Sequence, residues 1–226
     1  MFTLNSIKEI LNSDAGKQLL NEALTHRSYA VENNLNYDNQ RLEFLGDAVL
    51  EIILSEYLFN LYPASPEGQL TQMRSALVCE SALARLAQQC QLGTGLRIGR
   101  GEAECGGASR ESTLADLFEA VTGALFLGAG FDACRKIILE VFTRTYPDPR
   151  QMLIELNPKG KLQEYTQQHW GSTPVYKVFF QSGPQHAPYY EVEVQLRRYV
   201  AIGNGPNRKS AEGDAARKLY QFLTAK

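Results

Sequence analysis

The chain has 226 residues, a hydrophobic fraction of 44% and a formal net charge of −2, values ordinary for a globular protein of one large or two small domains. No apolar run reaches the roughly 18 residues that span a bilayer. The N-terminal stretch "MFTLNSIKEILNSD" lacks the basic start and apolar core of a secretory signal. We therefore expect a cytoplasmic protein with no membrane partner.

Helical spacing of apolar residues, with repeats of three and four, dominates residues 1–146. Turn signals such as Asn33-Asn34 and Gly106-Gly107 separate the segments, and no alternating strand pattern occurs. This part is therefore predicted to be an all-α domain. The predicted helices cover 6–13, 16–26, 40–62, 67–92, 112–130 and 131–146.

Residues 147–157 are predicted to be a linker, because "PDPRQMLIELNPKG" (147–160) holds three prolines that interrupt the helical pattern. Beyond it the period changes to helix, strands and helix. Residues 158–226 are therefore predicted to form a small α+β domain in the order helix, strands, helix, which makes the chain multidomain. The predicted elements are helix 160–170, strands within 174–181 and 189–203, and helix 207–223.

The two predicted domains carry opposite charges. Residues 159–226 hold ten Lys and Arg against five Asp and Glu, a balance of +5. Residues 1–158 hold thirteen against twenty, a balance of −7. A basic small domain suits a polyanion, and an acidic larger one suits a cation site.

The four cysteines, Cys79, Cys90, Cys105 and Cys134, show no CxxC spacing. In a cytosolic protein this favours free thiols over two disulfides.

Two pairs of acids lie at helical spacing inside apolar segments. Glu43 and Asp47 are four apart in "QRLEFLGDAVLEIILSEYLF", and Asp116 and Glu119 are three apart in "LADLFEAVTGAL". Each pair shares one helix face, and either pair alone is most often a solvated face. If the two helices meet, four oxygen ligands converge, and a hard cation such as Mg²⁺ or Mn²⁺ would offset their repulsion.

Iron is less favoured than magnesium. His26, His169 and His186 lie far from these acids, and no Glu-x-x-His pattern of the di-iron bundles occurs. Glu67, in "PEGQLTQMR", is either a favourable charge at the start of the next helix or a residue near the metal site.

Arg208 and Lys209 begin the predicted helix in "GNGPNRKSAEGDAARKL", where cations oppose the helix dipole. A phosphate bound at the helix start would resolve this conflict. The alternative is a pair of solvated charges compensated by Glu212.

Gln163 and Gln167, four apart on the first helix of the domain, offer both donors and acceptors. They either read sugar hydroxyls and base edges or are exposed polar residues. His186 lies in the turn "GPQHAP" between strands and fits either role.

Together these motifs resemble the ribonuclease III family. "RLEFLGDAVLE" is similar to the family signature. "ALTHRSY" (23–29), "EGQLTQMRSALV" (67–78) and "STLADLFEAVTGALFLGAG" (112–130) resemble its other helices in the same order. Residues 158–223 resemble a double-stranded RNA-binding domain through "LQEYTQ", "PVYKV", "GPQH" and "GNGPNRKSAEGDAA", and this resemblance implies an α-β-β-β-α order for the small domain. The resemblance covers nearly the whole chain.

The resemblance implies a metal site with Mg²⁺ as cofactor and Mn²⁺ as its substitute. Its carboxylates are Glu43, Asp47, Asp116 and Glu119. Asp47 and Glu119 are expected to act directly in catalysis, and Glu43 and Asp116 to anchor metal. The family also implies a homodimer whose signature helices pack across a two-fold axis, with Phe44 in the interface.

In the second domain, the resemblance implies minor-groove contacts for Gln163 and Gln167, with His186 in the next minor groove. It implies that Arg208 and Lys209 grip phosphates across the major groove. This mode reads duplex shape and 2′-hydroxyls more than sequence.

The expected activity is metal-dependent hydrolysis of double-stranded RNA, leaving 5′-phosphate and 3′-hydroxyl ends with short 3′ overhangs. The expected role is the processing of ribosomal RNA precursors and other structured transcripts. One position departs from the pattern, since Gln40 stands where bacterial members usually have Glu. This departure puts typical cleavage efficiency and ion preference in question.

Two alternatives remain. A non-catalytic double-stranded RNA-binding protein is opposed by the four intact acids. A helical hydrolase of a small phosphorylated substrate is opposed by the basic domain and the lack of a P-loop.

Overall fold

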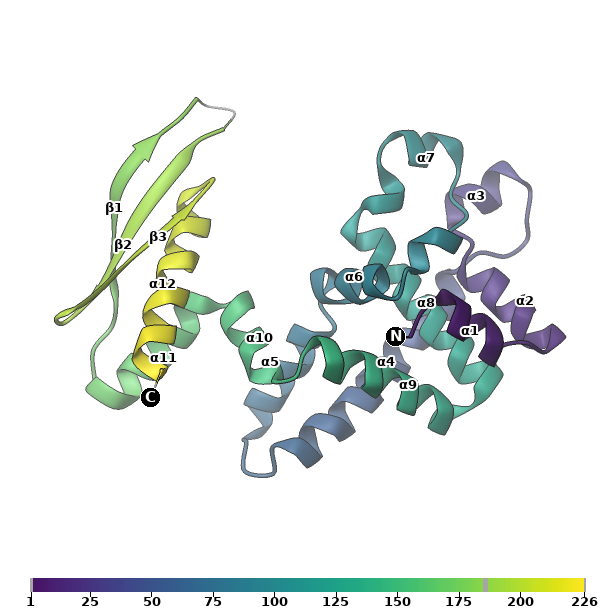
Figure 1. Cartoon of the computed structure of the whole chain (residues 1–226), viewed down its shortest axis with the longest axis horizontal. Helices are drawn as coiled ribbons and strands as arrows, with labels where there is room; N and C mark the ends of the chain where they lie inside the picture. The colour runs from purple at the N-terminus through teal and green to yellow at the C-terminus, as the bar shows by residue number, and fades with distance from the viewer. Residues whose placement is uncertain (1, 185–186, 226) are drawn as a thin grey trace. The chain divides into compact units, whose positions relative to one another are not determined.

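The structure, a computed structural model, describes residues 2–184 and 187–225. It forms two compact units, Met1–Pro149 and Arg150–Lys226 (Figure 1). The first unit is helical, and the second combines helices with a three-stranded sheet. The predicted fold class, an all-α domain followed by a small α-β-β-β-α domain, is confirmed. His186, a predicted RNA contact, lies outside the described residues.

The helices of the first unit begin and end at residues suited to those positions. α2 follows Ser13, whose hydroxyl accepts a hydrogen bond from the Gly16 backbone N–H at 3.1 Å. α8 ends at Gly130, whose φ of 84° favours glycine. The helices are α1 (Leu4–Ile10), α2 (Asp14–Ala23), α3 (Arg27–Glu32), α4 (Gln40–Leu61), α5 (Glu67–Leu77), α6 (Glu80–Gln89), α7 (Arg100–Glu104), α8 (Glu111–Ala129) and α9 (Phe131–Thr145), with 3₁₀ turns at Leu92–Gly95 and Gly107–Ser109.

α8 is the central helix of this unit, because α2, α4, α6 and α9 all pack against it (Figure 1). Phe118 of α8 meets Phe142 of α9 edge to face, with ring centroids 6.0 Å apart. By length and composition α8 also resembles a membrane span, but most of its apolar window is buried inside the unit. A helix that is apolar on nearly all sides is buried, here in a protein core.

The predicted single helix 67–92 is wrong. α5 ends at Leu77 and α6 begins at Glu80, with Cys79 between them in extended backbone. The bend lets α5 pack on α4 and α6 pack on α8, so both helices bury their apolar faces. Apolar spacing did not predict α3 or α7, because helices of six and five residues are too short to show a period.

α10 (Pro149–Leu156) lies in the stretch predicted to be a linker. The prolines flank this helix and do not interrupt it. Pro149 is its first residue, where a missing N–H costs nothing. Pro158 begins the next helix, after the capping residue Asn157. The predicted boundaries, 1–146, 147–157 and 158–226, stay a prediction.

The second unit packs helices against an antiparallel sheet in the order β1-β2-β3 (Figure 1). α12 packs on β2 and β3, and α11 packs on α12. A Cβ on Gly203 would lie 2.0 Å from the Ala215 backbone nitrogen, so glycine is required for α12 to lie this close to β3. The elements are α11 (Pro158–Trp170), β1 (Val175–Ser182), β2 (Tyr189–Leu196), β3 (Tyr199–Gly205) and α12 (Arg208–Thr224). The core holds Leu162, Val194, Leu196, Ala215, Ala216 and Leu219.

Candidate active site and nucleic-acid interface

Two glycines bring the backbones of α4 and α8 into direct contact. A Cβ on Gly46 would lie 1.8 Å from the Glu119 carbonyl oxygen. A Cβ on Gly123 would lie 2.3 Å from the Leu42 carbonyl oxygen. Both distances are far inside van der Waals contact, so any side chain would push the helices apart. Because Gly46 directly precedes Asp47, this contact brings the acids of α4 to those of α8.

Three of the four predicted metal ligands converge at this contact. One carboxylate oxygen from each of Glu43, Asp116 and Glu119 lies within 4.8 Å of the others, and all three residues are half-buried. Asp47 is exposed and is not part of this tight group, but its charge acts on both Glu43 and Glu119. The metal-binding and catalytic roles of the four acids stay predictions.

Burial and mutual repulsion disfavour the ionised forms of these acids. Burial, and after it the negative charges of Asp47, Glu43 and Asp116, together raise the pKa of Glu119 to about 8. Burial likewise raises the pKa of Glu43, with Asp116 and Asp38 adding to it. A divalent cation would relieve this cost, and carboxylate oxygens are the donors that Mg²⁺ and Mn²⁺ prefer. The residues therefore fit the expected metal.

His26 is a neighbour of these acids that its sequence position did not reveal. Burial raises the pKa of Asp116, and the charge of His26 acts in the opposite direction. The expectation that all histidines lie far from the acids is therefore wrong for His26. In its neutral form the ring is held in place through Nδ1, which accepts a hydrogen bond from the Ser28 backbone N–H at 3.2 Å. The signal available in the sequence was its place in the "ALTHRSY" motif.

Glu67 begins α5, which matches its predicted role as a helix N-terminal charge. Its carboxylate accepts a hydrogen bond from the Thr71 hydroxyl at 2.8 Å. Among the described residues, the converging group of acids does not include Glu67.

Phe44 projects from α4 into solvent, with 81% of its surface exposed. Ile52 and Phe59, which follow it on the same side of α4, are 56% and 68% exposed. This apolar stripe on α4 (Phe44, Ile52 and Phe59) is unusual for an exposed helix face.

The predicted RNA contacts within the described residues are all exposed. Gln163 and Gln167 lie on α11, and Arg208 and Lys209 begin α12. Asn207 caps α12, with its side-chain oxygen accepting a hydrogen bond from the Ser210 backbone N–H at 2.8 Å. Their roles in binding RNA stay predictions.

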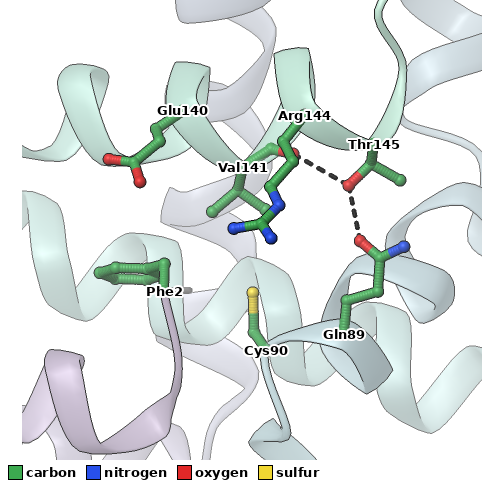
Figure 2. A pocket seen from close by; sticks show the side chains of 7 residues that line it. All are labelled: Phe2, Gln89, Cys90, Glu140, Val141, Arg144 and Thr145. Carbon is green, nitrogen blue, oxygen red and sulfur yellow. Dashed lines mark hydrogen bonds between the residues drawn. The ribbon is translucent and has the colours of Figure 1, made fainter.

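A cavity of about 210 Å³ lies beside α6 and α9, and none of the four acids Glu43, Asp47, Asp116 and Glu119 lines it (Figure 2). The Thr145 hydroxyl bonds to the Gln89 side chain and to the Val141 carbonyl on its wall. Burial raises the pKa of the Cys90 thiol in this cavity to about 11, so the thiol stays protonated and unreactive at neutral pH. The lining residues are Phe2, Gln89, Cys90, Glu140, Val141, Arg144 and Thr145.

Comparison with known families matches both units. The ribonuclease-III-like family matches residues 16–145, and the double-stranded RNA binding motif matches residues 158–223. The chain belongs to the ribonuclease III family. It is therefore an endoribonuclease whose catalytic domain is joined to a double-stranded RNA-binding domain, and so a hydrolase of double-stranded RNA.

Relatives in the ribonuclease III family match over most of their length. Ribonuclease 3 of Moorella thermoacetica is 43% identical over 208 residues, which cover 90% of this chain and 88% of the relative. Ribonuclease 3 of Natranaerobius thermophilus is 41% identical over 220 residues, covering 96% and 95%. A solved structure of the Campylobacter jejuni ribonuclease III nuclease domain superposes with a TM-score of 0.58 at 37% identity, covering 65% of this chain and 100% of that one.

Gln40, the departure from the ribonuclease III pattern, lies at the first residue of α4. Its side-chain oxygen accepts a hydrogen bond from the Arg27 guanidinium at 3.1 Å. Its backbone N–H donates to the Asp38 carboxylate at 3.1 Å. Arg27 therefore donates to the neutral amide of Gln40, where a glutamate would form an ion pair with it. Compared with a glutamate at this position, Gln40 contributes one negative charge fewer to the first turn of α4.

Proposed function

We propose that this chain cleaves double-stranded RNA by Mg²⁺-dependent hydrolysis, with Mn²⁺ able to substitute. The observation that carries the proposal is the convergence of carboxylate oxygens from Glu43, Asp116 and Glu119 within 4.8 Å. Their raised pKa values mark an arrangement that is unfavourable without a compensating charge. The products would carry 5′-phosphate and 3′-hydroxyl ends with short 3′ overhangs.

The four acids would have different roles, two in holding the metal and two in catalysis. Glu43 and Asp116, both half-buried, would anchor the metal. Glu119, at the α4–α8 contact, and the exposed Asp47 would act closest to the scissile phosphate. Bound Mg²⁺ would supply an activated water and stabilise the charge that develops on the leaving 3′-oxygen.

The apolar stripe on α4 supports a homodimer. Its three large side chains, Phe44, Ile52 and Phe59, are more than half exposed in one chain, and a second copy would cover them. The Campylobacter jejuni nuclease domain is described as having a flexible region involved in dimer formation. Two copies would present two acidic clusters to one duplex, one for each strand.

The second domain would hold the duplex through Gln163 and Gln167 in the minor groove, and through Arg208 and Lys209 on phosphates. His186 would contact the next minor groove. The expected substrates are ribosomal RNA precursors and other structured transcripts, and the expected compartment is the cytoplasm.

The alternative expected from the sequence, RNA binding without cleavage, rests only on the neutral Gln40, which accepts its hydrogen bond from Arg27, and membership of an endoribonuclease family opposes it. Cleavage of a long RNA duplex with Mg²⁺ distinguishes the two, comparing the natural chain with Glu119→Gln. We expect duplex RNA to be cut, single-stranded RNA and duplex DNA to be spared, and Glu119→Gln to abolish cutting. Binding without cutting in Mg²⁺ and in Mn²⁺ would overturn the enzymatic proposal and would make Gln40→Glu the next variant.

A further inference from the structure

Glu212 of α12 is a buried acid that joins two cations at the starts of two helices. Only 8% of its surface is exposed. One carboxylate oxygen accepts a hydrogen bond from Arg208 Nε at 2.8 Å, and the other accepts one from the Lys159 ammonium group of α11. Burial raises the pKa of Glu212, but the bonds from Lys159 and Arg208 outweigh burial and lower it. The carboxylate is therefore ionised, and each of its two oxygens accepts a hydrogen bond from a cation.

The bond to Glu212 fixes Arg208 without covering it. It uses the Nε–H, one of five N–H donors on the guanidinium. The Arg208 side chain remains 65% exposed, compared with 11% for the Glu212 side chain. An arginine that is already held at one edge loses less conformational entropy when its other N–H donors bind an anion. The Arg208 side chain is therefore preorganised for anion binding.

Lys159 is held from a second side. Its ammonium nitrogen lies 4.6 Å from the centroid of the Tyr176 ring, a cation–π contact. Lys159 therefore anchors Glu212 to α11, and Glu212 in turn orients Arg208 on α12. Lys209, the next residue, is exposed and makes no ion pair among the described residues.

We propose that Glu212 is a positioning residue for RNA binding, which holds the Arg208 guanidinium with its free donors toward a duplex phosphate. This inference rests on the proposed function, in which Arg208 and Lys209 bind RNA. If Glu212 only compensated the charges of Lys159 and Arg208, its removal would have the opposite effect on RNA affinity. Removing a negative charge beside a phosphate site strengthens binding by simple electrostatics, whereas loss of a positioning residue weakens it.

The test is a double-substitution cycle on the full chain, with RNA duplex affinity measured without divalent cation so that cleavage does not interfere. We expect Arg208→Ala to raise Kd about 10-fold and to lower the salt dependence by about one charge. We expect Glu212→Gln to raise Kd about 3- to 10-fold alone, but less than about 2-fold in the Arg208→Ala background. Glu193→Gln, which removes an acid on the sheet of the same domain, should leave Kd unchanged or slightly lower it.

Two outcomes separate the inference from the proposed function. If Arg208→Ala and Lys209→Ala both leave Kd unchanged, the proposed phosphate contacts are wrong. If these variants weaken binding but Glu212→Gln strengthens it, or weakens it equally in both backgrounds, Glu212 does not position Arg208.

Arg208→Lys provides a second test in case Glu212→Gln, at a buried position, does not fold. Arg208 is exposed, so this substitution leaves the core intact. It keeps the charge but has no Nε–H fork, so we expect Kd to rise about as much as for Glu212→Gln. Natural affinity in Arg208→Lys would overturn the inference.

Discussion

Gly46 of α4 faces the backbone of Glu119 in α8 so closely that a Cβ would lie 1.8 Å from the Glu119 carbonyl oxygen. The same contact sets the separation of the two helices and the distance between their carboxylates. Fold stability and the acidic cluster therefore both depend on Gly46, which directly precedes Asp47, together with Gly123 on the facing helix.

Replacing Gly46 with alanine should both destabilise the protein and damage cleavage. The added methyl group overlaps the α8 backbone, which cannot yield as a flexible side chain would, so we expect a loss of at least about 3 kcal/mol. Gly68→Ala is the matched control, because that position in α5 has nothing within 4 Å and should be neutral or stabilising by about 0.5–1 kcal/mol. Thermal unfolding of both variants checks this, and equal effects would refute the close contact.

Metal-free protein should lose stability as pH rises, through Glu119. Its pKa is raised to about 8 in the folded state from 4.5, so its stabilising contribution is complete below pH 4.5 and is lost as pH rises through 8. Glu119→Gln cannot ionise. The unfolding free energy of this variant should therefore exceed that of the natural chain by a margin that grows between pH 5 and pH 8.5, by roughly 1–3 kcal/mol.

Denaturant unfolding at both pH values, with chelator present, measures that margin. Mg²⁺ at pH 8.5 should stabilise the natural chain more than Glu119→Gln, because the bound cation offsets the repulsion. A margin that does not change with pH would show that Glu119 ionises normally.

Asp47→Asn should separate binding from chemistry. Asp47 is exposed, so the substitution leaves the core intact and duplex affinity should stay within about 2-fold. Loss of a carboxylate beside the proposed metal site should slow cleavage by at least about 100-fold, equivalent to a few kcal/mol in the barrier. Glu51→Gln, one turn further along α4, is the control and should cut RNA normally. Normal turnover in Asp47→Asn would remove Asp47 from the proposed machinery.

Phe44→Asp should convert the proposed dimer into monomers. The substitution puts a charge in the middle of an interface built on the apolar stripe on α4, and we expect the dimer dissociation constant to rise at least about 100-fold. Val31→Asp is the control, since Val31 is 69% exposed but lies on α3. Sedimentation equilibrium measures both. A natural chain that is monomeric at micromolar concentration would contradict the dimer itself.

Local spacing was sufficient for features set within one element. Glu43 and Asp47 share a face because a helix repeats every 3.6 residues, and Val194 and Leu196 point into one core because a strand alternates. The α4 and α8 helices, the acid pairs on them and the helix–strands–helix order of the small domain could all be predicted in this way. The family motifs then specified which acids belong together.

Packing between distant segments decided the rest. The break at Cys79 exists because α5 and α6 bury against different helices, which a continuous apolar pattern does not encode. His26 comes near Asp116, and Lys159 binds Glu212 across 53 positions of sequence. The sequence by itself determined the long helices, the strands and their chemical faces, because those depend on neighbours one turn away. Only the tertiary structure decided which faces meet, because that outcome depends on the packing of segments that are distant in the sequence.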